Sequence, residues 1–85
     1  MNVEFSAKSF GDYQYWQTNG KDKLKKIHQL LKEIARTSFT GTGKPEALKG
    51  DLQGYWSRRI DLEHRLVYRI FEGRIQVLSC RYHYR

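Results

Sequence analysis

Residues 65–82 read RLVYRIFEGRIQVLSCRY, and this stretch decides the fold. Apolar and polar side chains alternate on both sides of Glu72-Gly73, which is typical of two strands joined by a tight hairpin. The pattern predicts strands at Arg65–Phe71 and Arg74–Tyr82. A further strand of the same period is predicted just before them, at Tyr55–Ile60.

Two helices are predicted before these strands, after a short strand at Val3–Phe5. Ser6 is a typical N-cap for the first helix, and Asn19-Gly20 ends it because both residues tolerate the left-handed conformation. The second helix is predicted over residues 24–35, where apolar residues recur every three or four positions. We therefore expect an α+β fold, with two N-terminal helices packed on a mainly antiparallel sheet in one domain at residues 1–85.

The composition narrows the classes of partner. Sixteen basic and nine acidic side chains give a net charge of +7. This excess favours nucleic acid, although an anionic membrane or an acidic protein would satisfy the same charge. No apolar run is long enough to span a bilayer, and the single cysteine, Cys80, fits a reducing compartment and a small core residue. We expect a cytoplasmic protein that does not act at a membrane.

Alternation along the strands sorts their side chains onto two faces. The face expected to cover the helices carries Leu66, Tyr68, Ile70, Leu78, Cys80 and Tyr82. The opposite face is expected to gather Ser57, Arg59, Arg65, Arg69, Arg81 and His83. Arginine pairs bidentately with phosphate, so this second face is a candidate phosphate site. An ordinary solvated sheet face is the alternative interpretation.

Residues 37–54 show no period and are predicted to be irregular, which in so small a protein often indicates function. They contain Gly41-Thr42-Gly43-Lys44, but the first glycine is misplaced for a phosphate loop and Pro45 stands where a hydroxyl is needed. Cys80 and His83 would point to opposite faces of a strand, and no histidine has ligand spacing, so we predict no metal site.

The motifs GKPEALK, WSRRI, EHRLVY and CRYHY follow one another in residues 43–84, after an early DYQYWQ. In this order and spacing they resemble, over essentially the whole chain, the YoeB toxins of the RelE/ParE superfamily. The resemblance implies a RelE-like, microbial-ribonuclease-like fold and the toxin half of a type II toxin–antitoxin pair. It also implies an endonuclease that cleaves mRNA in the ribosomal A site without a metal or other cofactor.

The same resemblance assigns roles to residues. Glu46 would be the general base and His83 the general acid, Arg65 would stabilise the phosphate in the transition state, and Tyr84 would orient the substrate. The residues implied to contact or shape the substrate site are Lys49, Arg59 and Glu63, to which the alternation adds Arg81.

The alternation supports only part of that set. Arg59, Arg65 and His83 fall on one face without reference to any family. Glu46 lies in the irregular segment and rests on the resemblance alone, while Tyr84 joins the site only if the chain end curls.

The partners implied by the resemblance are mRNA on the ribosome, a YefM-type antitoxin, operator DNA through the toxin–antitoxin complex, and a second copy in a homodimer. One alternative is a non-catalytic module that binds RNA or the ribosome through the same basic face. Another is a superfamily relative that acts on a different target such as gyrase, against which the histidine near the C-terminus speaks.

Overall fold

The computed structural model describes residues 1–82 of the 85. Its elements are β1 (Asn2–Phe5), α1 (Ala7–Asn19), α2 (Lys21–Arg36), β2 (Glu46–Ala47), a 3₁₀ turn η1 (Gly50–Leu52), β3 (Trp56–Arg59), β4 (Arg65–Phe71) and β5 (Arg74–Ser79). The strands form one sheet in the order β1-β5-β4-β3-β2, in which β1 and β5 pair in parallel and the other neighbours are antiparallel. The predicted α+β fold, with its mainly antiparallel sheet, is confirmed.

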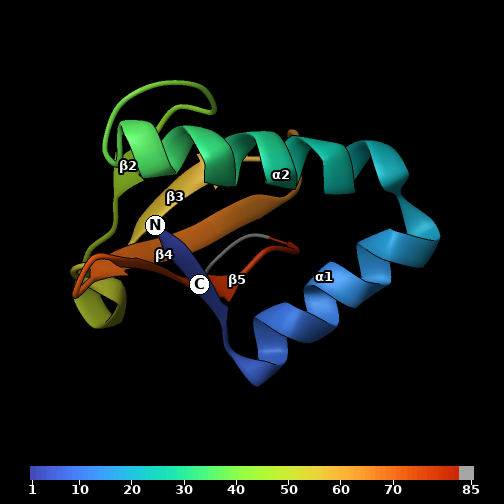
Figure 1. Ribbon diagram of the computed structural model, residues 1–85, viewed down its shortest axis with the longest axis horizontal. Coiled ribbons are helices and arrows are strands. Elements are labelled where there is room, and N and C mark those ends of the chain that lie inside the picture. The colour runs from blue at the N-terminus through green and yellow to red at the C-terminus, as the bar shows by residue number, and fades with distance from the viewer. Residues whose placement is uncertain (83–85) are drawn as a thin grey trace.

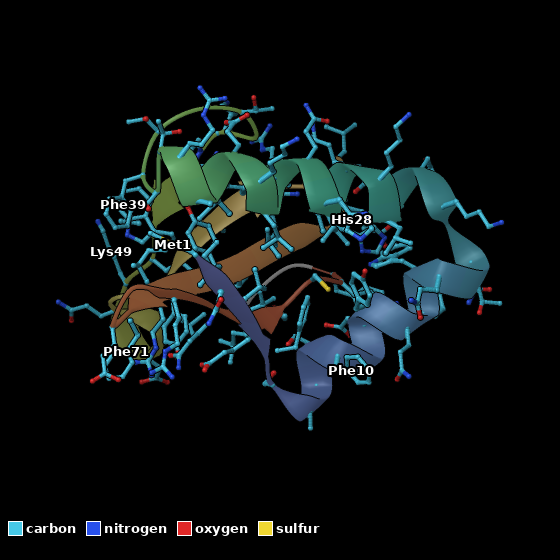
Figure 2. All side chains as sticks on the ribbon, in the orientation of Figure 1. Met1, Phe10, His28, Phe39, Lys49 and Phe71 are labelled. Carbon is cyan, nitrogen blue, oxygen red and sulfur yellow. The ribbon has the colours of Figure 1, made fainter. Side chains whose placement is uncertain are left out.

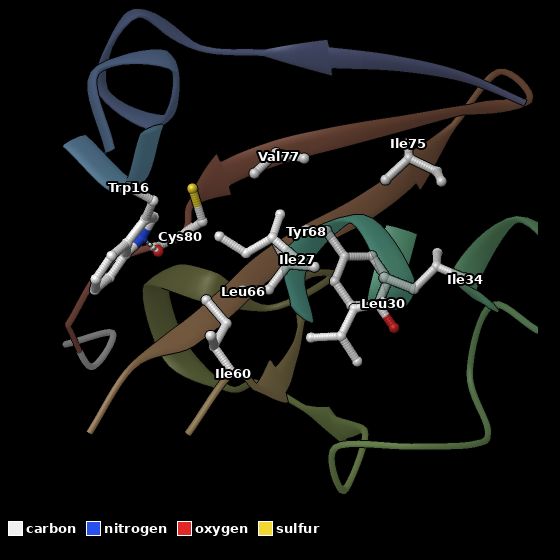
Figure 3. Close-up of a cluster of buried hydrophobic side chains, with 10 residues drawn as sticks. All are labelled: Trp16, Ile27, Leu30, Ile34, Ile60, Leu66, Tyr68, Ile75, Val77 and Cys80. Atoms are coloured by element: carbon white, nitrogen blue, oxygen red, sulfur yellow. Dashed lines mark hydrogen bonds between the residues drawn. The ribbon is translucent and has the colours of Figure 1, made fainter. Parts of the chain in front are cut away.

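Both helices lie against one face of the sheet, α2 across β3 and β4 and α1 beside the end of β5 (Figure 1). Together with the sheet they bury a cluster formed by Trp16, Ile27, Leu30, Ile34, Ile60, Leu66, Tyr68, Ile75, Val77 and Cys80 (Figure 3). Each fully buried aliphatic side chain contributes about 1.5–3 kcal/mol. Within residues 1–82 no helix is long and apolar enough to cross a membrane.

The junction between the helices fixes the position of Trp16. Ser6 caps α1 as predicted, since its Oγ accepts the Ser9 N–H at 3.1 Å. At Gly20, which separates the helices, an added Cβ would lie 2.8 Å from the Trp16 ring. Glycine therefore lets the indole pack into the core, where its Nε1–H donates to the Cys80 carbonyl at 2.8 Å.

Cys80 is fully buried among these residues. Burial is the main cause that raises the pKa of its thiol to about 12, with the nearby Asp12 charge acting in the same direction. The thiol is therefore protonated at neutral pH. Cys80 serves as the small core residue that the sequence predicts.

An irregularity in β5 changes which of its residues face the core. Val77 pairs with Tyr68, but Ser79 pairs with Val67, so one extra residue, Leu78, is inserted between them. Such a bulge shifts the alternation by one residue. The prediction that Leu78 covers the helices is wrong for this reason, and Val77, which is 2% exposed, takes that place. Tyr82, predicted on the same face, is half exposed beyond the end of β5.

Candidate active site

The sheet surface turned away from the helices, hereafter the helix-free face, is defined by the strand register. Glu46 lies opposite Ser57, Ser57 opposite Val67, and Val67 opposite Ser79, so these residues form one row across four strands. In the next row Arg59 lies opposite Arg65. Residues directly opposite each other on antiparallel strands project to the same face. The helix-free face therefore carries Glu46, Ser57, Arg59, Arg65, Val67 and Ser79.

Glu46 belongs to this face because the segment expected to be irregular contains the short strand β2. Its side chain is exposed at the edge of the sheet. Neighbouring strands lie about 4.8 Å apart, so β2 is about 10 Å from β4. A carboxylate on β2 and a guanidinium on β4 can thus approach one polar group from two sides.

Arg58, which precedes Arg59 in the chain, holds the loop before β2 in place from the core face of the sheet. Its guanidinium is fully buried and donates to Glu33 at 2.9 Å and to the Tyr68 hydroxyl at 3.2 Å. It also donates, at 2.7–3.3 Å, to the carbonyl oxygens of Thr37, Thr40 and Thr42. The loop that leads to Glu46 is therefore fastened to both α2 and β3.

The next contact of this loop reaches Arg59 itself. The Gly43 carbonyl accepts the Arg59 N–H at 2.7 Å, and the backbone of Gly43 has φ +87°. An added Cβ at Gly43 would lie 3.1 Å from the Arg59 backbone. Glycine is required at this position for both reasons, which connects the sequence GTGKPE to the geometry of the site.

Glu33 is the anionic partner in the Arg58 network. The Thr42 N–H donates to its carboxylate, and Arg58 lies beside the same oxygen. Hydrogen bonding from Thr42, through its backbone first and then its side chain, is the main cause that lowers the pKa of Glu33 below its ordinary value, and the charge of Arg58 acts in the same direction. Glu33 and Arg58 were not singled out from the sequence. The alternation along β3 could have identified Arg58, because it puts this residue on the core side of the sheet, where a buried guanidinium requires acceptors.

Arg59 and Arg65 form a pair of like charges on directly opposed positions, which typically destabilises a sheet. Within residues 1–82 neither guanidinium has a carboxylate within 4 Å. Arg65 is oriented by its Nη1, which donates to the carbonyl oxygens of Asp61, Leu62 and His64 at 2.8–3.3 Å. The pair is therefore a candidate site for an anion.

Two other predicted residues lie near the ends of this face. Lys49 is exposed just before η1, on the β2 side of the molecule (Figure 2). Glu63 is exposed in the turn before Arg65; its N–H donates to Asp61 Oδ1 at 2.8 Å and its carboxylate lies 3.5 Å from His64 Nε2.

Arg81 lies elsewhere than the alternation predicts. Strand β5 ends at Ser79, so the pattern does not extend to it. Its guanidinium lies 3.4 Å from the centre of the Tyr15 ring on α1 and donates to the Tyr82 hydroxyl at 2.8 Å. The prediction that Arg81 shares a face with Arg65 is therefore corrected, because the side chain stacks on a helix.

His83 and Tyr84 lie outside the described residues. The chain that leads to them passes beside Arg65, because the Arg65 N–H donates to the Tyr82 carbonyl at 3.0 Å. Within residues 1–82 no group of three or more His, Cys, Asp or Glu side chains is arranged to hold a metal ion. A cavity of about 260 Å³ lies apart from the arginine pair, bounded by Glu4, Phe5, Ser6, Tyr55, Gln76, Val77 and Leu78.

Comparison with known proteins identifies the family. Residues 5–84 match the model of the YoeB-like toxins of bacterial type II toxin–antitoxin systems. Toxin YoeB of Synechocystis sp. is 52% identical over 99% of this chain and 98% of its own. The solved YoeB/ParE toxin from Agrobacterium tumefaciens is 48% identical and superimposes with a TM-score of 0.95, covering 99% of this chain and 100% of that one.

A third similar protein, YoeB of Staphylococcus aureus, is 52% identical, with 99% of this chain and 98% of that chain covered. Its structures include a heterotetrameric YoeB–YefM complex, with a TM-score of 0.92, and a dimer, with a TM-score of 0.93. The family model spans nearly the whole sequence, and these solved relatives superimpose on this chain with TM-scores of 0.92 to 0.95. The chain therefore belongs to the YoeB-like toxins of bacterial type II toxin–antitoxin systems.

Proposed function

We propose that this chain is a ribosome-dependent, metal-independent endoribonuclease that cleaves mRNA in the ribosomal A site and so inhibits translation. One observation carries the proposal: the Glu46 carboxylate shares the helix-free face with the Arg59–Arg65 pair, which has no carboxylate partner within residues 1–82. A base beside an unneutralised anion site is what attack of a ribose hydroxyl on its own phosphate requires.

In this mechanism Glu46 accepts the proton of the 2′-OH as the 2′ oxygen bonds to phosphorus. Arg65, assisted by Arg59, stabilises the negative charge that gathers on the phosphate oxygens. His83 donates a proton to the 5′ oxygen as its bond to phosphorus breaks, and Tyr84 orients the nucleotide. The products are a 2′,3′-cyclic phosphate on the upstream fragment and a 5′-hydroxyl on the downstream fragment.

The surface charge supports action on a ribosome. The chain carries a net charge of +7, and exposed lysines along α2 (Lys21, Lys25 and Lys32) are separate from the arginines of the helix-free face. The lysines provide contacts to ribosomal RNA that do not depend on sequence, whereas the arginine pair contacts the phosphate to be cleaved. A role in translation implies a cytoplasmic location.

The remaining partners are proposed from the relatives. YoeB of Staphylococcus aureus forms a dimer and a heterotetramer with YefM. We propose that this chain forms a homodimer and binds an antitoxin of the YefM type, and that the toxin–antitoxin complex binds operator DNA. An acidic antitoxin segment laid over the Arg59–Arg65 pair would neutralise the toxin by occupying its anion site.

The test is cleavage of a defined message on purified ribosomes, in the presence and absence of EDTA. Wild-type toxin is expected to cut under both conditions. Glu46→Gln removes the base without changing side-chain size and is expected to slow cleavage by about 10²–10⁴-fold. Glu72→Gln is the matched control, because Glu72 is an exposed carboxylate in the hairpin between β4 and β5, at the end of β4 far from Arg65, and is expected to cut within about threefold of the wild-type rate.

Three outcomes contradict the proposal. Equal rates for Glu46→Gln and wild type would remove the assigned base. Ribosome binding without cleavage by the wild-type chain would favour the non-catalytic binding module. Unimpaired translation together with inhibited gyrase would favour a different target.

A further inference from the structure

Tyr82, the last described residue, has a backbone conformation that its neighbours impose. Its φ is +64°, which is uncommon for a residue with a large side chain. Both of its backbone polar groups are bonded: the N–H donates to His64 Nδ1 at 2.7 Å, and the carbonyl accepts from the Arg65 N–H at 3.0 Å. Costly conformations persist where the surroundings determine them, so these two bonds set the direction of the chain at Tyr82.

His64 is itself fixed on several sides. It is 9% exposed, and its ring stands edge-on to Trp16 with the centroids 4.8 Å apart. Because Nδ1 accepts the amide proton of Tyr82, the proton of the neutral ring is on Nε2, the nitrogen that lies 3.5 Å from the Glu63 carboxylate. The imidazole thus presents a single acceptor in a defined place.

The chain just before Tyr82 is also fastened, to helix α1. The Cys80 N–H donates to Asp12 Oδ2 at 3.0 Å, and the Cys80 carbonyl accepts from Trp16 Nε1 at 2.8 Å. These bonds hold the chain where β5 has ended, but they lie on the core side. After Cys80, the two backbone hydrogen bonds of Tyr82 are the last main-chain bonds that hold the chain within residues 1–82.

We propose that His64 is a positioning residue for cleavage: by accepting the Tyr82 amide proton at Nδ1, it fixes the backbone of Tyr82, the residue that immediately precedes the proposed general acid, His83. This inference rests on the proposed function. His83 is bonded directly to Tyr82 in the chain, so a change in the backbone of Tyr82 acts on the residue next to it, the proposed acid. Misplacement of a reacting group by about 1 Å can cost about 10²-fold in rate.

Two substitutions at His64 separate the hydrogen bond from mere loss of the ring. In His64→Asn the amide oxygen takes the position of Nδ1 and keeps the acceptor, whereas in His64→Gln it takes the position of Nε2 and does not. His28→Gln is the control for loss of an imidazole, since His28 is exposed on α2 and bonds the Tyr13 hydroxyl. Single-turnover cleavage on ribosomes and hydrogen exchange of the Tyr82 amide, followed by NMR, are measured on the full chain.

We expect His64→Gln to lower kcat by about 10- to 100-fold with little change in KM, and to speed exchange of the Tyr82 amide. His64→Asn is expected to restore both to within about threefold of wild type. A third variant deletes only the N–H, by replacing the amide between Arg81 and Tyr82 with an ester, and is expected to match His64→Gln. This variant keeps every side chain, so it decides the question even if a substitution of His64 unfolds the chain.

Equal activity of His64→Gln and wild type would overturn the inference, as would equal losses in His64→Gln and His64→Asn. A fully active ester variant would overturn it as well. If the wild-type chain itself does not cleave, the proposed function fails, and the positioning role fails with it. The exchange of the Tyr82 amide would then still show whether the His64 bond exists, so the two failures are distinguishable.

Discussion

Arg58 and Arg59 are consecutive in the sequence, yet they lie on opposite faces of the sheet in opposite electrostatic settings. On the core face Arg58 is fully buried and donates to a carboxylate, a phenol and three carbonyls. On the helix-free face Arg59 is exposed opposite Arg65, with no carboxylate partner within residues 1–82. The comparison separates a structural arginine, whose donors all have acceptors, from a candidate functional arginine, whose side chain has no acceptor among residues 1–82.

The far end of the helix-free face supports the same distinction. Arg69 donates to Gln76 at 2.6 Å and lies over the rings of Tyr55 and Phe71. Arg74 forms ion pairs with Glu4 at 2.9 Å and Glu72 at 2.8 Å. Arginines at this end are already partnered, so among the described arginines of the helix-free face the two without a carboxylate or side-chain acceptor are Arg59 and Arg65, at the end opposite Arg74.

The largest expected effect is on stability, at Arg58. Arg58→Met should lower the free energy of unfolding by about 3–5 kcal/mol, because Glu33 and the carbonyls of Thr37, Thr40 and Thr42 each lose a hydrogen bond from a buried guanidinium. Urea denaturation measures the change. A loss below about 1 kcal/mol would show that the network does not hold the loop, and the contrast between Arg58 and Arg59 would disappear.

The next effect is on catalysis, at Arg65. Arg65→Lys keeps the charge but not the planar fork, and should slow cleavage on ribosomes by about 10²–10³-fold. Arg69→Lys is the matched control on the same face and should cut within about threefold of wild type, since Gln76 and two rings occupy that guanidinium. Similar losses for both would mean that the whole face, rather than one end, binds the message.

The acid dependence of stability should report the Arg58 network. The pKa of Glu33 is lowered in the folded chain, so its ionised form contributes stability at neutral pH. That contribution should begin to decline as the pH falls through the ordinary value of 4.5 and should be lost below the depressed pKa of the folded chain. Glu33→Gln should therefore lower the free energy of unfolding at pH 7 and make it fall less steeply as the pH is lowered below about 5. Urea denaturation at a series of pH values measures this dependence. The same dependence on pH in Glu33→Gln and wild type would contradict the prediction.

The smallest effect is expected at Arg59. Arg59→Met removes one of two opposed like charges and should raise the free energy of unfolding by about 0.2–1 kcal/mol while slowing cleavage. Arg74→Met, which breaks two ion pairs at the far end, should change stability by about 0–1 kcal/mol in the opposite direction. If Arg59→Met destabilises the chain, the pair is not a strained anion site.

Strand alternation was sufficient to predict which face of β4 covers the helices and that Arg59 and Arg65 share the opposite face; their direct pairing comes from the structure. It was sufficient because β3 and β4 are regular and directly paired, so the period of two holds along both. The core position of Cys80 follows from its apolar environment in the same pattern. These features depend on the local sequence pattern and can therefore be predicted from it.

Three features depended on tertiary contacts that no period reveals. Glu46 joins the face because β2 pairs with β3 and Arg58 holds the preceding loop through contacts between residues far apart in the chain. Leu78 turned away from the core because a bulge shifts β5 by one residue. Arg81 does not lie on the predicted face, because β5 ends before it and its guanidinium stacks on the Tyr15 ring.

The most direct test of the account is the chemistry of the cut ends. Message cleaved by the wild-type chain on ribosomes in EDTA should carry a 2′,3′-cyclic phosphate or its hydrolysis product upstream and a 5′-hydroxyl downstream, as measured by mass spectrometry of the fragments. This result would mean that the ribose hydroxyl attacks, with Glu46 and the Arg59–Arg65 pair as base and anion site. A 3′-hydroxyl with a 5′-phosphate would mean attack by water and would contradict the account.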